Sequence, residues 1–379
     1  MKNRIGYFDI AKGIGIILVV IAHIEYMPLD LREYIVSFHM PAFFVISGML
    51  MKLTGEKERP IKPLILHKLQ RIMLPYLVFS IIYPLVDLAK FGITGKGYSI
   101  QLFLQDLLAG VAMIGVSVLW FLPALFFSEL IVLAAVKNAK KPLVWFLLVL
   151  LFLALWQIPF LVPGMALVMW RIIYCSVLVM LGYVVFPFIN KVSGYPVILL
   201  FVSVALFVIL YFTSLANGIV DLHFITFGNK ALYYLNAMMG SLAMILLSIF
   251  IESKLMNRIG RMLEFFGRHS LFIMITHINF FVLYVSERLA FALSGLTPRA
   301  KEPVFNIVAT VSTMLIETVL ILMWEKITGA VCRRCQRQKH LAQQLCGNSG
   351  HSGYAEKAHR QYCPEYILLA AACAVHAQQ

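Results

Sequence analysis

The chain has 379 residues, of which 61% are hydrophobic and 13% are charged, and its mean hydropathy is +0.86. A soluble globular domain is typically about 45–50% apolar and about 25% charged, so this composition excludes an ordinary water-soluble protein. The net charge of +14 comes from Lys and Arg that stand between apolar runs. This placement indicates membrane topology and an acidic membrane surface or ligand, with no nucleic-acid partner.

Ten apolar runs are long enough to cross a hydrocarbon layer of about 30 Å as helices. They cover residues 8–25, 34–52, 72–91, 119–137, 143–161, 169–188, 196–214, 231–252, 269–290 and 304–325. The runs are continuous rather than alternating, which favours helices over a barrel as the way to satisfy backbone polar groups in lipid. The predicted fold class is therefore all-α, a polytopic bundle of about ten transmembrane helices.

Lys and Arg concentrate in alternate connecting segments, beginning with the N-terminus. Because basic loops stay on the cytoplasmic side, both termini are predicted to be cytoplasmic, and the protein to be multi-pass in the cell (inner or plasma) membrane. Residues 1–330 are predicted to form the membrane domain. Residues 331–379 are predicted to form a disordered cytoplasmic tail. The Cys and His residues of this tail lack a second close ligand pair, so no metal site is predicted.

Three ionisable residues lie in the first span: Asp9, Lys12 and His23. A charge near the bilayer centre costs at least about 2.5–3.5 kcal/mol, so such residues face a bundle interior or a water-filled cavity. Eleven residues separate Lys12 from His23, which places them within about 20° of one helix face and about 16 Å apart along the axis. One stripe is thus predicted to carry a cation near the inner surface and an imidazole near the outer one. The alternative is that Lys12 snorkels inward and His23 only anchors the outer interface.

The next two spans add polar residues at both ends. His39 opens the second span at a depth similar to that of His23, and interface anchoring and a site role are both open for it. Ser47 and Gly48 follow, and small residues of this kind favour close helix packing. Lys68 and Arg71 share a face at the inner end of the third span. They predict an anion site, for example for phosphate groups.

Two later spans carry polar residues deep inside apolar runs. Glu129 lies well inside the fourth span, so a cavity or a cationic partner is expected for it. Trp120 stands nine residues earlier, on the opposite face of the helix. His277 lies near the middle of the ninth span, where it either makes a structural hydrogen bond between helices or belongs to a site.

Several short motifs follow one another along these spans. They are Phe8-Asp9-Ile10-Ala11-Lys12-Gly13-Ile14, the Lys12-to-His23 spacing, Ser37-Phe38-His39-Met40-Pro41-Ala42-Phe43-Phe44, Ser47-Gly48, Leu119-Trp120-Phe121-Leu122-Pro123-Ala124, and Ser270-Leu271-Phe272 with Thr276-His277. Together they resemble the membrane-bound acyltransferase type-3 family, in particular its fucose 4-O-acetylase-like subgroup. The resemblance runs over about residues 4–328.

The resemblance implies ten spans, cytoplasmic termini and transfer of an acyl group, commonly acetyl from acetyl-CoA. The acceptor is expected to be a hydroxyl of a surface polysaccharide or a lipid-linked sugar, and no cofactor is expected to be permanently bound. The resemblance implies that Lys12 and His23 are essential for catalysis, and it matches the family's basic pair to Lys68 and Arg71. The mechanism predicted from these residues places the CoA phosphates at Lys68 and Arg71, and Asp9 is predicted to orient Lys12. Lysine replaces the family's commoner arginine at positions 12 and 68, which weakens bidentate phosphate binding there.

His39, Glu129, Trp120 and His277 are predicted to bind the acceptor or to support His23. The ordinary pKa of histidine, about 6.5, suits a general base near neutrality, and a transient acyl-histidine is the other possible role of His23. A transporter of a lipid-linked sugar or small molecule is the alternative function, because intramembrane charges also mark transport pathways. An inverted repeat or paired broken helices would favour it, and the sequence shows neither.

Overall fold

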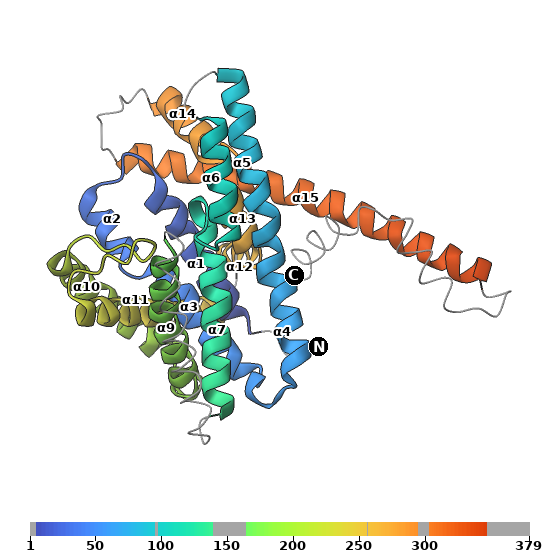
Figure 1. Ribbon diagram of the computed structural model, residues 1–379. Helices are drawn as coiled ribbons and strands as arrows, with labels where there is room; N and C mark the ends of the chain where they lie inside the picture. Colours follow the sequence, from blue (N-terminus) through green and yellow to red (C-terminus); the bar gives the residue numbers. More distant parts are fainter. Residues whose placement is uncertain (1–4, 95–97, 139–163, 256, 295–302, 347–379) are drawn as a thin grey trace.

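The computed structural model describes residues 5–94, 98–138, 164–255, 257–294 and 303–346, with backbone only for 93–94, 165, 293–294, 303 and 330–346. Within these ranges the chain is helical, and one isolated bridge between Asp221 and Thr226 is the sole extended pairing. The all-α prediction is confirmed. Figure 1 shows the helices as an elongated bundle from which α15 projects.

The α-helices are α1 (Gly6–His23), α2 (Leu29–Val36), α3 (His39–Leu53), α4 (Ile61–Lys68), α5 (Leu74–Thr94), α6 (Ile100–Val111), α7 (Phe121–Asn138), α9 (Met165–Val192), α10 (Pro196–Asn217), α11 (Lys230–Lys254), α12 (Arg258–Arg268), α13 (Ser270–Thr276), α14 (Val282–Ser294) and α15 (Pro303–Cys346). Short 3-10 helices are η1 (Glu56–Glu58) and η3 (Ser117–Trp120), and a π-helix is η2 (Leu69–Met73). Helix α1 is central, because it packs against α3, α11, α12, α13 and α15.

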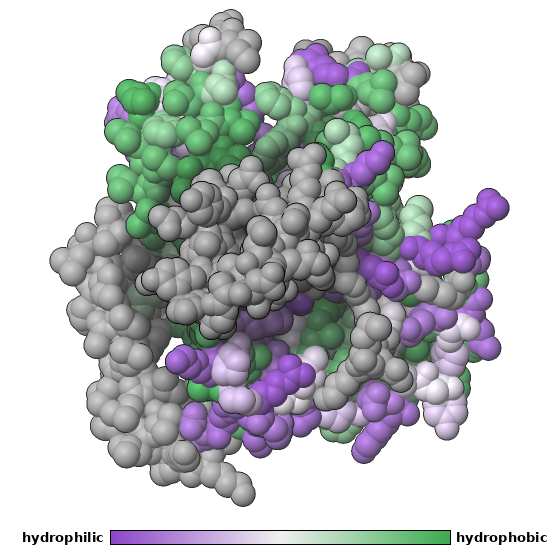
Figure 2. All heavy atoms as spheres, turned by 90° about the vertical axis from the view of Figure 1, so that its right-hand side faces the viewer, coloured by the Kyte–Doolittle hydropathy of each residue, from purple (hydrophilic) through white to green (hydrophobic). Residues whose placement is uncertain are grey.

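Eight helical segments among the described residues are long and apolar enough to cross a membrane. They are Gly6–His23, Leu29–Leu53, Ile61–Gly92, Ser117–Asn138, Ala166–Val192, Pro196–Asn217, Lys230–Lys254 and Val304–Gly329. Each overlaps a predicted span, and the predicted span 143–161 lies outside the described residues. In Figure 2 apolar residues dominate the upper part of one face and hydrophilic residues its lower part, as in a bundle with a polar end outside the hydrocarbon.

The prediction of one continuous helix over 269–290 is wrong. Helix α13 ends at Thr276 and α14 begins at Val282, and Phe281 between them has a φ of 63°. Backbone groups at this break find partners in neighbouring elements, since the Tyr83 hydroxyl donates to the Ile275 carbonyl and Lys90 Nζ donates to the Asn279 carbonyl at 3.2 Å. Such internal partners are what permit an interrupted helix at membrane depth, and hydropathy alone does not reveal them.

Helix α15 runs for 44 residues and ends at Cys346. The predicted domain boundary at residue 330 therefore falls inside a helix rather than at the end of one. The rest of the predicted tail, residues 347–379, lies outside the described residues, and its disorder stays a prediction.

Glycines bring the central helices into backbone contact. A Cβ built on Gly48 of α3 would lie 1.8 Å from the Val179 carbonyl oxygen of α9, and one on Gly182 would lie 2.0 Å from the Val45 oxygen. Helices α1 and α12 meet in the same way, because a Cβ on Gly267 would lie 1.7 Å from the Asp9 oxygen. The close packing predicted at Gly48 is confirmed, and it fixes α3, the helix that carries His39, against α9.

Replacing Gly48 with alanine is expected to destabilise the fold by about 1–3 kcal/mol, because the added methyl group forces α3 and α9 apart. Thermal unfolding of the detergent-solubilised protein measures the effect. Gly92→Ala is the matched control, since a Cβ there has no neighbour within 4 Å. Equal melting temperatures for Gly48→Ala and the unmodified protein would contradict this account of the packing.

Candidate active site

Two cavities lie along α1 and share one wall residue, Met274. The first, here the Lys12 cavity, has a volume of about 300 Å³ and is lined by Lys12, Phe43, Arg71, Phe121 and Glu129 among others. The second, here the His23 cavity, has a volume of about 340 Å³. Its lining includes His23, His39, Trp120, Asp221 and His223.

The predicted stripe on α1 is present. Lys12 lines the first cavity and His23 the second, so each side chain turns inward. Asp9 is buried, and its Oδ1 lies 2.7 Å from Lys12 Nζ. This ion pair matches the orienting contact expected of Asp9, and it partly neutralises the ammonium at the cavity wall.

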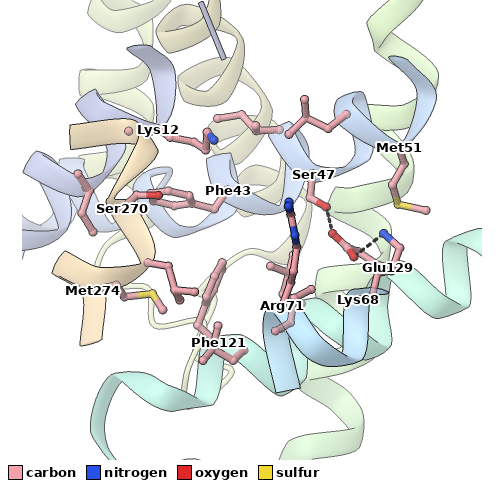
Figure 3. A pocket seen from close by; sticks show the side chains of 18 of the residues that line it. Lys12, Phe43, Ser47, Met51, Lys68, Arg71, Phe121, Glu129, Ser270 and Met274 are labelled. Atoms are coloured by element: carbon pink, nitrogen blue, oxygen red, sulfur yellow. Dashed lines mark hydrogen bonds and ion pairs between the residues drawn. The ribbon is translucent and has the colours of Figure 1, made fainter. Parts of the chain in front are cut away.

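Arg71 enters the Lys12 cavity from the π-helical turn η2 (Figure 3). The local sequence explains this turn. Pro75 has no N–H to donate to the Arg71 carbonyl, and the preceding Leu74 N–H bonds to Leu69, five residues back. Lys68 and Arg71 both line this cavity, so the two cations that i, i+3 spacing predicted on one face do meet one space.

Lys68 is buried in a network of opposite charges. Its Nζ lies 2.7 Å from Glu129 Oε2 and 2.9 Å from Glu56 Oε2, and the Ser47 hydroxyl donates to the other Glu129 oxygen. Burial raises the pKa of Glu56, and Lys68 opposes that rise. The cationic partner expected for Glu129 is thus Lys68. Sequence reasoning missed Glu56, because nothing local links η1 to the fourth span.

Glu129 lies apart from the other predicted acceptor-binding residues. It lines the Lys12 cavity, whereas His39 and Trp120 line the His23 cavity. The helical separation of Trp120 and Glu129 is therefore borne out in space, with one residue in each cavity.

Three histidines meet around the His23 cavity, and their Nδ1 atoms share one arrangement. Those of His23, His39 and His277 lie 2.8, 2.9 and 2.9 Å from the carbonyl oxygens four residues earlier. A carbonyl only accepts, so in the neutral ring Nδ1 carries the proton and Nε2 keeps a lone pair. His23 is exposed to the cavity while His39 and His277 are buried. This arrangement makes His23 Nε2 the accessible base.

His277 continues the last turn of α13, because its backbone N–H donates to the Ile273 carbonyl four residues earlier, and its ring reaches His23. The two rings meet edge to face, with centroids 5.1 Å apart. The adjacent Thr276 hydroxyl contacts both carboxylate oxygens of the fully buried Glu317, at 2.9 and 2.8 Å. Sequence analysis missed Glu317, although a carboxylate inside the apolar run 304–325 is the same kind of signal as Glu129.

Arg171 supports the part of the His23 cavity wall that carries His223. Sequence analysis did not predict it as a site residue. It is 1% exposed, and its guanidinium donates to the His223 carbonyl through Nε and Nη2, at 3.1 and 2.7 Å, and to the Ile114 carbonyl at 3.0 Å. Trp120 stacks on the His223 ring at 5.3 Å with an interplanar angle of 9°. Burial and then Arg171 lower the pKa of His223 to about 4, so this ring is neutral near pH 7. Its position inside the predicted span 169–188 was a signal in the sequence, because a charged side chain within an apolar span needs a partner or a cavity.

A comparison with protein families assigns the chain as a whole. The model of the acyltransferase domain matches residues 5–322, which include every candidate residue named above. The chain belongs to the acyltransferase type-3 family. No curated protein and no solved structure matches it.

This membrane acyltransferase therefore presents two chemically different cavities. The Lys12 cavity is lined by more cations than carboxylates, namely Lys12, Lys68, Arg71 and Arg268 against Glu56 and Glu129, which suits the binding of an anionic group. The His23 cavity carries imidazoles with unprotonated Nε2 atoms, which suits the removal of a proton from a hydroxyl.

Lys68→Met is expected to destabilise this acyltransferase by about 3–5 kcal/mol, because Glu56 and Glu129 then remain buried without their cation. Adding Glu129→Gln should restore part of the loss, since it removes one unpaired charge and keeps a hydrogen-bonding group for Ser47. Thermal unfolding in detergent compares the single and double variants. A double variant that is less stable than Lys68→Met would refute the charge-pairing explanation.

Proposed function

We propose that this acyltransferase transfers an acetyl group from acetyl-CoA to a hydroxyl of a surface polysaccharide or a lipid-linked sugar, as in the fucose 4-O-acetylase-like subgroup. The observation that carries the proposal is the pair of cavities that share Met274 along α1. One offers cations for a phosphorylated donor, and the other offers a general base for a hydroxyl acceptor. The proposed location is the cell membrane with both termini in the cytoplasm.

The donor is assigned to the Lys12 cavity. Arg71 is the main phosphate ligand in this proposal, because its planar guanidinium donates in a fork that matches phosphate oxygens. Lys68 already has two carboxylate partners, so its part in phosphate binding requires that Glu56 give way. The apolar walls at Phe43, Phe121 and Met274 suit the uncharged arm that carries the thioester.

The transfer is a single displacement at the acyl carbon. The acceptor hydroxyl enters from the His23 cavity, and its oxygen bonds to the acyl carbon as the carbon–sulfur bond breaks. His23 Nε2 takes the hydroxyl proton and passes it to the departing sulfur, so CoA leaves as the thiol. The buried His277 ring beside His23 and the Nδ1 bond to Val19 hold the imidazole in place for this step.

A transporter is the competing function, and the break between α13 and α14 is a feature that transporters share. The family match and the separation of cations from imidazoles favour the enzyme. Release of free CoA from acetyl-CoA in the presence of acceptor distinguishes the two, because transport leaves the thioester intact.

His23→Ala is expected to lower acetyl transfer by about 10²–10⁴-fold, because it removes the base that takes the proton of the acceptor hydroxyl. Mass spectrometry of surface glycans, which follows the loss of one acetyl group, measures the effect in cells. The variant must reach the membrane in normal amount and still show thermal stabilisation by acetyl-CoA. A stable variant that acetylates at the normal rate would refute the assignment of His23.

Arg71→Ala is expected to raise the KM for acetyl-CoA about tenfold or more, since a charged hydrogen-bonding pair with phosphate contributes about 1.5–3 kcal/mol. Steady-state kinetics of CoA release measures it. The matched control is Lys62→Ala, which removes an exposed cation from the same segment outside the cavity lining. If both variants raise KM equally, general surface charge and not Arg71 accounts for donor binding.

A further inference from the structure

The wall of the His23 cavity is formed in part by the loop 218–229 between α10 and α11. Asp221 and Thr226 pair across this loop through two backbone hydrogen bonds of 2.6 and 2.8 Å. Asn217 joins its ends, because Nδ2 donates to the Phe227 carbonyl and Oδ1 accepts from the Asn229 N–H. Hydrogen bonds within the loop and at its two ends thus hold it in one conformation.

Arg171 fixes the middle of this loop. Its three hydrogen bonds to the His223 and Ile114 carbonyls attach the loop to α9 and to the segment before η3. The stack of Trp120 on His223 joins the loop to the start of α7. These contacts place Asp221 on the wall of the cavity that the histidines of α1 and α3 also line.

The Asp221 carboxylate is only partly used by the loop itself. Oδ1 accepts the His223 N–H at 2.7 Å and the Phe224 N–H at 3.1 Å. Among the described residues, none donates a hydrogen bond to Oδ2, and the side chain is half-buried at the cavity wall. An ionised carboxylate in this setting accepts strong hydrogen bonds from hydroxyl groups.

The described wall of the His23 cavity carries a negative charge and no lysine or arginine. Of the described residues that line it, none is Lys or Arg, and Asp221 carries the one carboxylate. Arg171 lies behind the wall with its donors turned to backbone carbonyls. Arg171 and Arg32 lie near enough to act electrostatically on Asp221 and His23, but neither lines the cavity. An anionic acceptor would therefore meet the Asp221 carboxylate with no cationic side chain on the described wall, whereas the hydroxyl groups of an uncharged polyol can donate hydrogen bonds to that carboxylate.

We propose that Asp221 is a specificity-determining residue that hydrogen-bonds an uncharged, hydroxyl-rich acceptor, such as a neutral sugar ring, and disfavours acidic sugars. This inference rests on the proposed acetyl transfer and names the acceptor class for the same site. Asp221 acts on acceptor binding and leaves donor binding to the Lys12 cavity.

The test uses the full chain in lipid nanodiscs with labelled acetyl-CoA and two acceptors, octyl glucoside and octyl glucuronide, kept below their micellar concentrations. These probes differ only at C6, which is a hydroxymethyl group in the glucoside and a carboxylate in the glucuronide, so acetylation is compared at the ring hydroxyls that both share. The neutral glycoside is expected to be acetylated with at least about tenfold higher kcat/KM. Asp221→Asn, whose amide oxygen still accepts the two loop N–H groups, should raise the KM for the neutral glycoside about tenfold and narrow the preference, with the KM for acetyl-CoA unchanged.

Asn217→Ala is the matched control, because it loosens the ends of the loop without changing the charge of the cavity. It should leave the ratio of neutral to acidic acceptor unchanged. Equal use of both glycosides, use of neither, or the same change of ratio in Asn217→Ala as in Asp221→Asn would overturn the role of Asp221. Loss of CoA release with every acceptor, together with no thermal stabilisation by acetyl-CoA, would instead refute the proposed function itself.

Discussion

Hydrocarbon leaves a charged side chain with two options, a partner or a water-filled space, and α1 carries an ammonium, a carboxylate and an imidazole through the centre of the bundle. Asp9 and Lys12 satisfy each other, and the open side of Lys12 meets a cavity. His23 turns its Nδ1 to the Val19 carbonyl and faces a second cavity. The Lys12 cavity and the His23 cavity therefore follow from the free-energy cost of placing ionisable side chains of α1 in hydrocarbon.

That arrangement requires neighbouring helices to come very close. Gly13 and Gly267 let α1 and α12 meet at backbone distance, and Gly48 and Gly182 do the same for α3 and α9. Close contact matters here because lipid supplies no hydrophobic force between helices, so packing and internal hydrogen bonds carry the association. The glycines thus fix α1, which carries Lys12 and His23, against α12, and α3, which carries His39, against α9.

The parts of the site that could be predicted from sequence are those with a local cause. Helical periodicity places Lys12 and His23 on one stripe, and the same arithmetic separates Trp120 from Glu129. Hydropathy finds the eight described spans but reads 269–290 as one helix, because the groups that satisfy the break come from distant elements, such as Tyr83 and Lys90 of α5.

The parts of the site that could not be predicted depend on contacts between segments far apart in the sequence. Glu56, Lys68 and Glu129 meet from three separate elements, and Arg171 meets a loop that lies about fifty residues further along the chain. Helical periodicity cannot pair them, although a charged residue inside an apolar run marks each of Glu129, Arg171 and Glu317 as needing a partner. The amino-acid sequence therefore indicates that these three side chains have partners, but it does not identify the partners, because they come from other helices and loops.

The Lys68 network also shapes how the Lys12 cavity attracts an anion. Two carboxylates surround one ammonium, so this buried cluster is not a net cation and its attraction for phosphate is weak while Glu56 stays in place. Glu56 stands on η1, a short turn outside the candidate membrane spans, whereas Ser47 and Lys68 hold Glu129 inside the bundle. The partner that can move is therefore Glu56. A phosphate that displaced it would meet Lys68 beside Arg71, which reconciles the pairing seen here with a donor site that uses both residues.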